Sequence, residues 1–245
     1  MKDITFYDDT PFQYGYSSSE EIIAYINPIL KKLIRDNTNK IIADIGCGCG
    51  RNLFYAKDFS AKMFGVDVSV RSLNFARQLV DSDKLELIEG DNLSIPLEKN
   101  TIDLVISDGV CHHTGDTFKA LSECVRILKP SGKLYLAVYK KFRYYPFLYY
   151  FLGSPLRILN RYQFGNLAIE NLFIPLHYFI YKLFRKRSFS LFETRNIFFD
   201  YFITPIATFH SKSNIINWVN NLNSKVIDYY PTSGNCHVFI ISKDE

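Results

Sequence analysis

The chain has 245 residues and a mass of 28.5 kDa, which is enough to bury a substantial core and fits one α/β domain with an insertion. Its net charge of +4 is too small to indicate a nucleic-acid partner by itself. The five cysteines form no Cys-x-x-Cys pair and no apolar segment opens the chain, so we expect a cytoplasmic protein. The Cys47-x-Cys49 pair lies among glycines, where small residues are wanted, so we expect no metal.

A strand, a glycine turn and a helix are predicted in residues 41–56. An apolar run ends at Ile45, glycines stand at positions 46, 48 and 50, and a helix-compatible segment follows. Glycine tolerates positive φ and lets the backbone approach a ligand closely, while a helix start offers free N–H groups to an anion. A second short run stops at Asp67. An acidic residue at the end of the second strand of a doubly wound sheet can accept ribose hydroxyls.

Strand-like and helix-like segments alternate along most of the chain. This is the βαβ rhythm of a parallel sheet with helices on both faces. The Lys-Pro-Ser-Gly break at 129–132 is expected to end one helix and begin the next strand, because proline disfavours helix in the residue before it. The expected strands are 62–67, 85–89, 102–107, 133–139, 225–229 and 237–242, and the expected helices are 70–80, 117–128 and 212–222.

The spacing Asp44-x-Gly-x-Gly-x-Gly, with Asp67 downstream, resembles the cofactor signature of the class I S-adenosylmethionine-dependent methyltransferases. Dinucleotide-binding proteins prefer Gly-x-Gly-x-x-Gly, whose third glycine comes one position later. Further family motifs follow in the expected order at 90–96, 102–105, 125–132 and 134–136, so the resemblance covers residues 38–140 closely and 205–243 loosely. The chain departs from the family at Ser131, which replaces a usual glycine away from the chemistry.

The resemblance implies a Rossmann-like α/β fold, with a doubly wound, mostly parallel seven-stranded sheet whose final strand is antiparallel. We expect a single methyltransferase domain over 1–245 with an aromatic-rich, helical insertion after the fifth strand. The expected parts are an amino-terminal lid and helix at 1–37, a cofactor-binding core at 38–139, the insertion covering the acceptor site at 140–205, and the last helix and strand pair at 206–245.

S-adenosylmethionine carries an adenosine, a sulfonium and an amino-acid tail, and the resemblance implies candidate residues for the first and last. Its product is S-adenosylhomocysteine. Two of the implied residues have structural alternatives: Asp67 could cap the helix entered at Ser69, and Asp91 could be an ordinary turn residue. The implied contacts are Asp67 and Val68 for the ribose, Asp91, Asn92 and Leu93 for the adenine, Gly46, Cys47, Gly48 and Asp44 for the tail, and Ser107 and Asp108 for its ammonium group.

Two histidines follow the fourth expected strand. The segment Gly109-x-x-His112-His113-Thr114 is similar to one that small-molecule methyltransferases of this family carry at this place. Imidazole has an ordinary pKa of about 6.5, so either ring could take a proton from the acceptor. The alternative is that the rings only hydrogen-bond the loop and shape the pocket. The sequence does not choose between the two histidines.

Residues 13–20 precede the first strand, where family members often fold a lid over the cofactor. Tyr14 or Tyr16 would then face the sulfonium, since aromatic faces attract cations. A helix start capped by one of the serines at 17–19 explains the same residues equally well. His210, after the insertion, is a candidate for the acceptor pocket, although such residues are more often packing elements.

The insertion combines charge with aromatic residues. Residues 140–190 contain nine basic and one acidic residue, a net charge of +8, and fifteen aromatics. Prolines and glycines are expected to break the segment into short helices, and none of its apolar runs reaches the roughly 20 residues of a transmembrane helix.

Three functions follow from these features. The favoured one is methyl transfer to an oxygen or nitrogen of a small-molecule or lipid-like acceptor, because an aromatic insertion can wall off water from a compact pocket. The second is an RNA or protein methyltransferase that uses the basic insertion, and the third is a non-catalytic S-adenosylmethionine-binding protein. A peripheral contact with an anionic membrane also fits the insertion. The oligomeric state and the acceptor are not readable from the sequence.

Overall fold

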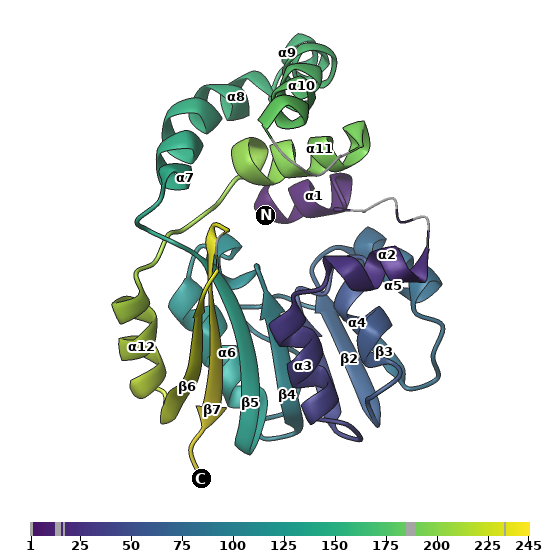
Figure 1. The fold of residues 1–245 in the computed structure, drawn as a ribbon, viewed down its shortest axis with the longest axis vertical. Helices are drawn as coiled ribbons and strands as arrows, with labels where there is room; N and C mark the ends of the chain where they lie inside the picture. Colours follow the sequence, from purple (N-terminus) through teal and green to yellow (C-terminus); the bar gives the residue numbers. More distant parts are fainter. Residues whose placement is uncertain (1, 13–15, 17, 185–189, 233) are drawn as a thin grey trace. The chain divides into compact units, whose positions relative to one another are not determined.

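The computed structural model describes residues 2–12, 16, 18–184, 190–232 and 234–245 (Figure 1). The chain forms two compact units. The first comprises Met1–Pro11, Ser18–Lys141 and Ile206–Glu245, and the second comprises Phe12–Ser17 and Phe142–Pro205.

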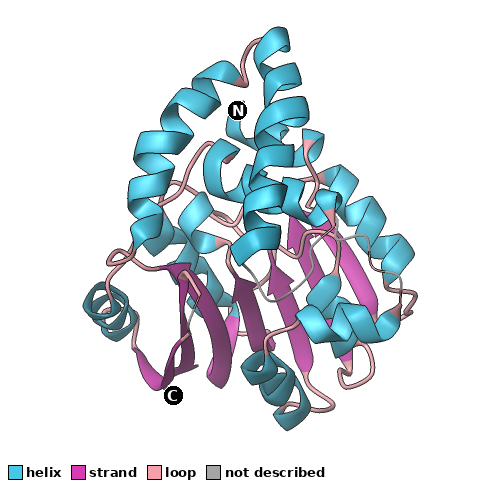
Figure 2. Ribbon diagram, turned by 45° about the horizontal axis from the view of Figure 1, so that its top comes forward, coloured by secondary structure: helices cyan, strands magenta, loops and turns pink. Residues whose placement is uncertain are grey.

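The first unit is built on a seven-stranded sheet in the order β3-β2-β1-β4-β5-β7-β6 (Figure 2). Strands β1 to β5 are parallel to their neighbours, whereas β7 lies antiparallel between β5 and β6. This confirms the predicted doubly wound sheet with an inserted final strand. The strands are β1 (Ile41–Ile45), β2 (Lys62–Asp67), β3 (Leu85–Glu89), β4 (Ile102–Asp108), β5 (Leu128–Tyr139), β6 (Ser224–Pro231) and β7 (Cys236–Lys243).

Alternate side chains of each central strand enter two different apolar layers. On β5, Leu134 and Leu136 join the core beneath α6 and α12, whereas Tyr135 and Ala137 join the core beneath α3, α4 and α5. The two layers arise because successive strand residues point to opposite faces. The helices of this unit are α1 (Lys2–Asp9), α2 (Ser19–Tyr25), α3 (Pro28–Asp36), α4 (Arg51–Ala56), α5 (Val70–Leu79), α6 (Thr117–Ile127) and α12 (Lys212–Asn220).

The break at 129–132 lies inside a strand and not before one. Strand β5 already begins at Leu128, which pairs with Ile102, and the pairing resumes only at Leu104 with Lys133. The intervening residues form a bulge in which Ser131 has a φ of +62°. The prediction of where this strand begins was therefore wrong by five residues, because the proline and glycine interrupt the pairing without ending the strand.

The second unit contains five helices among its described residues. The prolines do not separate them as predicted, because helical structure runs unbroken from 144 to 159 and from 163 to 184. Its π-helical turns, Leu148–Leu152, Ile169–Phe173 and Phe199–Ile203, each end two or three residues before a proline. A wider turn accommodates proline, which lacks an N–H and crowds the preceding carbonyl. The helices are α7 (Tyr144–Phe147), α8 (Gly153–Leu159), α9 (Gln163–Ala168), α10 (Ile174–Phe184) and α11 (Leu191–Phe198).

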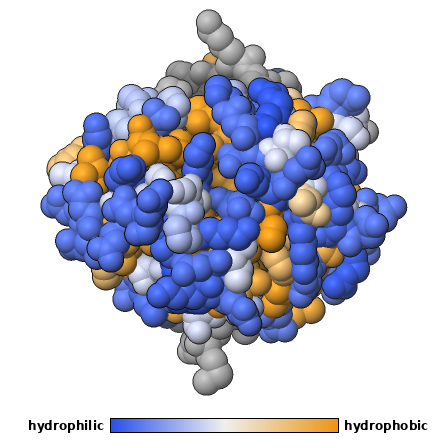
Figure 3. Space-filling view, turned by 90° about the horizontal axis from the view of Figure 1, so that it is seen from below, coloured by the Kyte–Doolittle hydropathy of each residue, from blue (hydrophilic) through white to orange (hydrophobic). Residues whose placement is uncertain are grey.

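No helix within the described part of the chain is long and apolar enough to cross a membrane. The face drawn in Figure 3 is mostly hydrophilic, with separate apolar patches between its polar residues.

Candidate active site

The glycine turn between β1 and α4 has the backbone that its sequence predicts. Gly46, Gly48 and Gly50 all have positive φ, at 73°, 51° and 86°. A Cβ on Gly46 would lie 2.3 Å from the Val110 side chain, so this residue must be glycine for steric reasons as well. A Cβ on Gly48 would meet nothing within 4 Å, and the same is true of Gly109 in the loop after β4. Open space therefore lies next to the backbone of both loops.

Asp67 ties the end of β2 to the glycine turn. Its Oδ2 accepts a hydrogen bond from the Gly48 N–H at 2.8 Å, and its Oδ1 accepts one from the Ser69 N–H at 2.9 Å. Burial raises the pKa of Asp67, and these backbone donors oppose that effect. A carboxylate offers about four acceptor positions, so Asp67 retains capacity for a ligand hydroxyl. Ser69 and not Asp67 caps α5, through its hydroxyl and the Ser72 N–H.

Asp44 is buried behind the turn and only 1% exposed. Its Oδ2 has no hydrogen-bond partner. Burial and then the nearby charge of Asp108 raise the pKa of Asp44 to about 8, so this carboxyl holds a proton at neutral pH. Asp108 itself is paired with Arg51 at 3.1 Å. A buried polar atom without a partner is costly, and a polar ligand group near this position would satisfy it.

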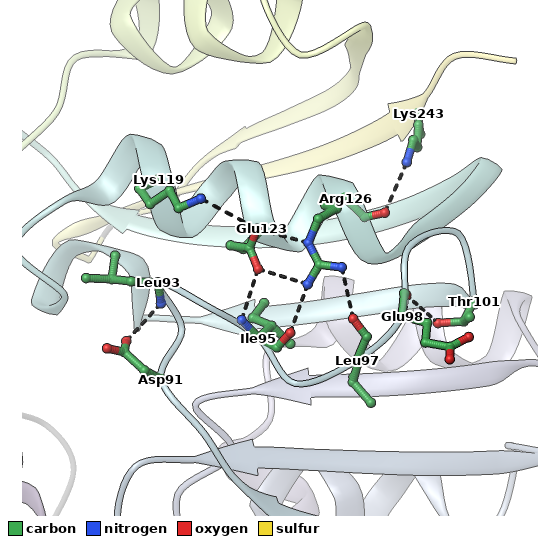
Figure 4. Close-up of polar contacts among 10 residues, drawn as sticks. All are labelled: Asp91, Leu93, Ile95, Leu97, Glu98, Thr101, Lys119, Glu123, Arg126 and Lys243. Carbon is green, nitrogen blue, oxygen red and sulfur yellow. Dashed lines mark hydrogen bonds and ion pairs between the residues drawn. The ribbon is translucent and has the colours of Figure 1, made fainter.

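The loop after β3 is clamped to α6 (Figure 4). The Arg126 guanidinium donates to the carbonyls of Ile95 and Leu97 at 2.8 and 2.9 Å, and Glu123 both pairs with Arg126 and accepts from the Ile95 N–H. Asp91 lies at the start of this loop, where its Oδ1 accepts from the Leu93 N–H at 2.8 Å, as the turn interpretation expects. Asn92 is buried with an Oδ1 that has no partner, so this position retains an unsatisfied acceptor.

The two histidines after β4 differ in environment. His112 is 0% exposed, its two ring nitrogens have no hydrogen-bond partner, and its ring lies 3.7 Å from that of Tyr139. Burial lowers the pKa of His112 well below its ordinary value, so this ring is neutral. His113 is half-buried, and its Nδ1 lies 2.7 Å from the carbonyl oxygen of Ile206. A carbonyl only accepts, so Nδ1 carries the proton and the neutral ring has its lone pair on Nε2.

Helix α1 connects the two sides of this edge and was not predicted. It lies above the carboxyl ends of the parallel strands in Figure 1. Asp8 accepts from the Ser69 hydroxyl and the Arg71 N–H, both at 3.0 Å, while the Tyr7 ring lies 6.4 Å from that of His113. The sequence gives only one signal for this contact, a carboxylate suited to a helix N-terminus, and no pattern reveals which helix it meets.

The family model for a methyltransferase domain matches residues 43–136. This stretch of the chain is therefore similar to a methyltransferase domain. The match spans the glycine turn, Asp67, the loop after β3 and both histidines.

The relatives of this chain differ in the acceptors that their names give. A demethylmenaquinone methyltransferase of Lactococcus lactis is 28% identical over 66% of this chain and 70% of its own length. A probable tRNA methyltransferase 9B of Bos taurus is 33% identical over 40% of this chain. The chain spans 21% of that protein and 28% of a 37.1 kDa transposon protein of Streptomyces fradiae, which is 35% identical over 95 residues.

Solved structures share the fold of this chain. The magnesium protoporphyrin IX methyltransferase of Synechocystis, solved with bound S-adenosylhomocysteine, superposes with a TM-score of 0.59 at 14% identity and covers 98% of this chain and 97% of its own. An S-adenosylmethionine-dependent methyltransferase structure from Listeria monocytogenes gives a TM-score of 0.58 at 16% identity, over 89% of this chain and 97% of that one. At these identities the similarity establishes the fold alone.

The remaining candidate residues lie apart from one another. Ser107 is buried with its hydroxyl 3.1 Å from the Cys111 thiol, and Val68 follows Asp67 at the same sheet edge. His210 is buried, and its Nε2 lies 3.0 Å from the hydroxyls of Thr117 and Thr208, which are the contacts of a packing residue. Tyr16 belongs to the second unit, and Tyr14 lies outside the residues that the structure describes.

Proposed function

We propose that the protein transfers a methyl group from S-adenosylmethionine to an oxygen or nitrogen of a small-molecule or lipid-like acceptor, with His113 as the base. The orientation of His113 carries this proposal. The Ile206 carbonyl holds Nδ1 as the donor, which leaves Nε2 as the basic nitrogen at the ligand-binding edge of the sheet. His112 is the weaker candidate because its ring is buried and packed on Tyr139.

The cofactor fits the residues at the carboxyl edge. Asp67 would accept the ribose hydroxyls, and the backbone of Gly46 to Gly48 would lie along the amino-acid tail. The open space at Gly48 and the unpaired Oδ2 of Asp44 support this placement, since the first admits a ligand and the second lacks a hydrogen-bond partner. The loop at 91–93 would enclose the adenine, and the carbonyls near Ser107 and Asp108 would receive the ammonium group. The bound cofactor supplies an electrophilic methyl group on a sulfonium.

The protein's own residues would then position the acceptor and remove its proton. Methyl transfer is an in-line displacement, so holding the two reactants in line is the main contribution. His113 Nε2 would take the acceptor proton, and the Ile206 carbonyl would stabilise the imidazolium through the Nδ1–H. The lipid-like class is supported by the relative named for demethylmenaquinone, which the chain spans over 70% of its length.

The second candidate is methylation of RNA. The probable tRNA methyltransferase 9B supports it, as does the positive charge of residues 142–205. The two candidates predict different labelled products. We expect methyl-labelled S-adenosylmethionine to pass its label to the organic extract of a cell lysate and not to its RNA. Label found only in RNA would favour the second candidate.

The role of His113 can be tested on the labelled acceptor. Removing a general base costs 10²-fold or more, so we expect His113→Ala to lower methyl transfer by about 10² or more while S-adenosylmethionine binding stays unchanged. His112→Phe preserves the packing on Tyr139 and is expected to lose less than about tenfold. His237→Ala, on β7, is the control that should behave as wild type. Full turnover by His113→Ala would remove this residue from the chemistry.

A further inference from the structure

Exposed apolar side chains gather in the second unit. Of the twenty large apolar side chains that are exposed among the described residues, seventeen lie between 142 and 205. Apolar side chains that are exposed in a group, and not singly, mark surfaces that bind a partner or a membrane.

These side chains form stripes on ordered helices. Leu172, Leu176, Phe179 and Leu183 follow one another at intervals of four, three and four residues, which places them on one face of the helical run that ends in α10. They are 61%, 52%, 58% and 63% exposed. On the other helical run, Phe151 is 67% exposed.

The opposite sides of the same helices are fixed by internal contacts. The hydroxyl of the buried Tyr145 donates to the carbonyl of Asp200 at 3.1 Å, and Arg157 donates to the carbonyl of Phe202 at the same distance. Arg195 forms a bidentate pair with Glu170, with its shortest contact at 2.7 Å. These contacts fix the orientation of the helices and leave the apolar stripes exposed.

Basic residues accompany the stripes. Residues 142–205 contain eight Lys or Arg and three Asp or Glu, a net charge of +5, which leaves −1 for the rest of the chain. Arg161 lies between the two helical runs and Lys182 stands within one turn of Phe179, and both are exposed. Lysine is depleted at the cores of protein–protein interfaces, whereas exposed aromatic and leucine side chains with flanking cations suit an anionic bilayer surface.

We infer that the second unit docks on the surface of an anionic lipid bilayer, with the stripe at 172–183 entering the headgroup region and Arg161 and Lys182 contacting lipid phosphates. The evidence for docking is the exposed apolar stripe and the basic residues beside it, and it does not depend on the proposed methyl transfer. The further step, that the acceptor resides in the lipid phase, rests on the proposed methyl transfer.

Flotation of the full chain with vesicles tests the docking. We expect binding to phosphatidylcholine vesicles that contain phosphatidylserine, weakening as salt rises, and much weaker binding to phosphatidylcholine alone. Leu176→Ser with Phe179→Ser should weaken binding at least about tenfold, and Arg161→Gln or Lys182→Gln about fivefold each. Ile227→Ser and Lys225→Gln make the same changes on exposed positions of β6 in the first unit and should bind as wild type.

Three results would overturn the docking. The first is a lack of vesicle binding, and the second is equal weakening of binding by the β6 control variants. The third is a dimer in sedimentation that Leu176→Ser with Phe179→Ser dissociates, because the stripe would then be an interface between two copies of the chain. Each variant is first titrated with S-adenosylmethionine. Thermal unfolding that matches wild type shows that both units of the variant are folded. A vesicle result that contradicts the docking then leaves the proposed transfer untouched, and a failure of wild type to bind S-adenosylmethionine contradicts only the transfer.

Discussion

At the scale of single residues, burial and tertiary contacts distinguish the candidate residues from one another. The sequence places two histidines side by side and gives no reason to prefer either. The difference between them is tertiary: Tyr139 covers one ring, and the Ile206 carbonyl orients the other. Both partners are distant in sequence, so no local pattern contains this information. Asp67 is different, because its place after a short apolar run already predicts the edge of the sheet at which it lies.

Asp44 makes the stability of the protein depend on pH. Its pKa is about 8 in the folded protein and near 3.9 in an unfolded chain. The folded state therefore binds the proton more tightly, and the stabilisation from this carboxyl is complete below pH 4 and is lost as the pH rises through 8. We expect Asp44→Asn to lack this loss. Urea unfolding between pH 5 and pH 8.5 measures the free energy of unfolding of both proteins. If that free energy changes with pH in the same way in wild type and Asp44→Asn, the result contradicts the burial of an uncompensated carboxyl.

At the scale of elements, apolar periodicity predicts most of the first unit. Strands β2 and β3 coincide with their predictions, and β4, β6 and β7 differ by at most two residues at an end. Such runs are dictated by which side chains enter the core, a property visible in the sequence. The prolines of the second unit were misread because a π-helical turn lets a helix continue past them, and the sequence signal for such a turn is the same as for a helix end.

The clamp between α6 and the loop after β3 is expected to support both folding and cofactor binding. Arg126→Met removes donors to two carbonyls and leaves the 7%-exposed Glu123 with Lys119, at 3.7 Å, as its cationic partner. We therefore expect a loss of about 2–4 kcal/mol in the free energy of unfolding and weaker S-adenosylmethionine binding. Adding Glu123→Leu removes the buried charge and should recover part of the stability. Thermal and urea unfolding measure both, and a double variant less stable than the single one would contradict a charge penalty.

At the scale of the whole molecule, the chain forms two units of opposite character. The first buries its apolar residues in two layers around a sheet and is nearly neutral, at −1. The second exposes apolar residues and carries +5. Composition predicted that residues 140–205 depart from the rest. The sequence did not predict whether their apolar side chains are buried or exposed, because the same periodicity is typical of a helix that faces a core and of a helix with an exposed apolar stripe. The contacts between the helices give the answer.

The central claim is that adenosine binds at the carboxyl edge of the parallel sheet through Asp67. The most direct measurement is calorimetric titration of S-adenosylmethionine into wild type, Asp67→Ala and Asp228→Ala, the last removing an exposed carboxylate on β6. The account predicts that Asp67→Ala weakens binding at least about tenfold, or about 1.4 kcal/mol, while Asp228→Ala binds as wild type. Equal affinity of wild type and Asp67→Ala would contradict it.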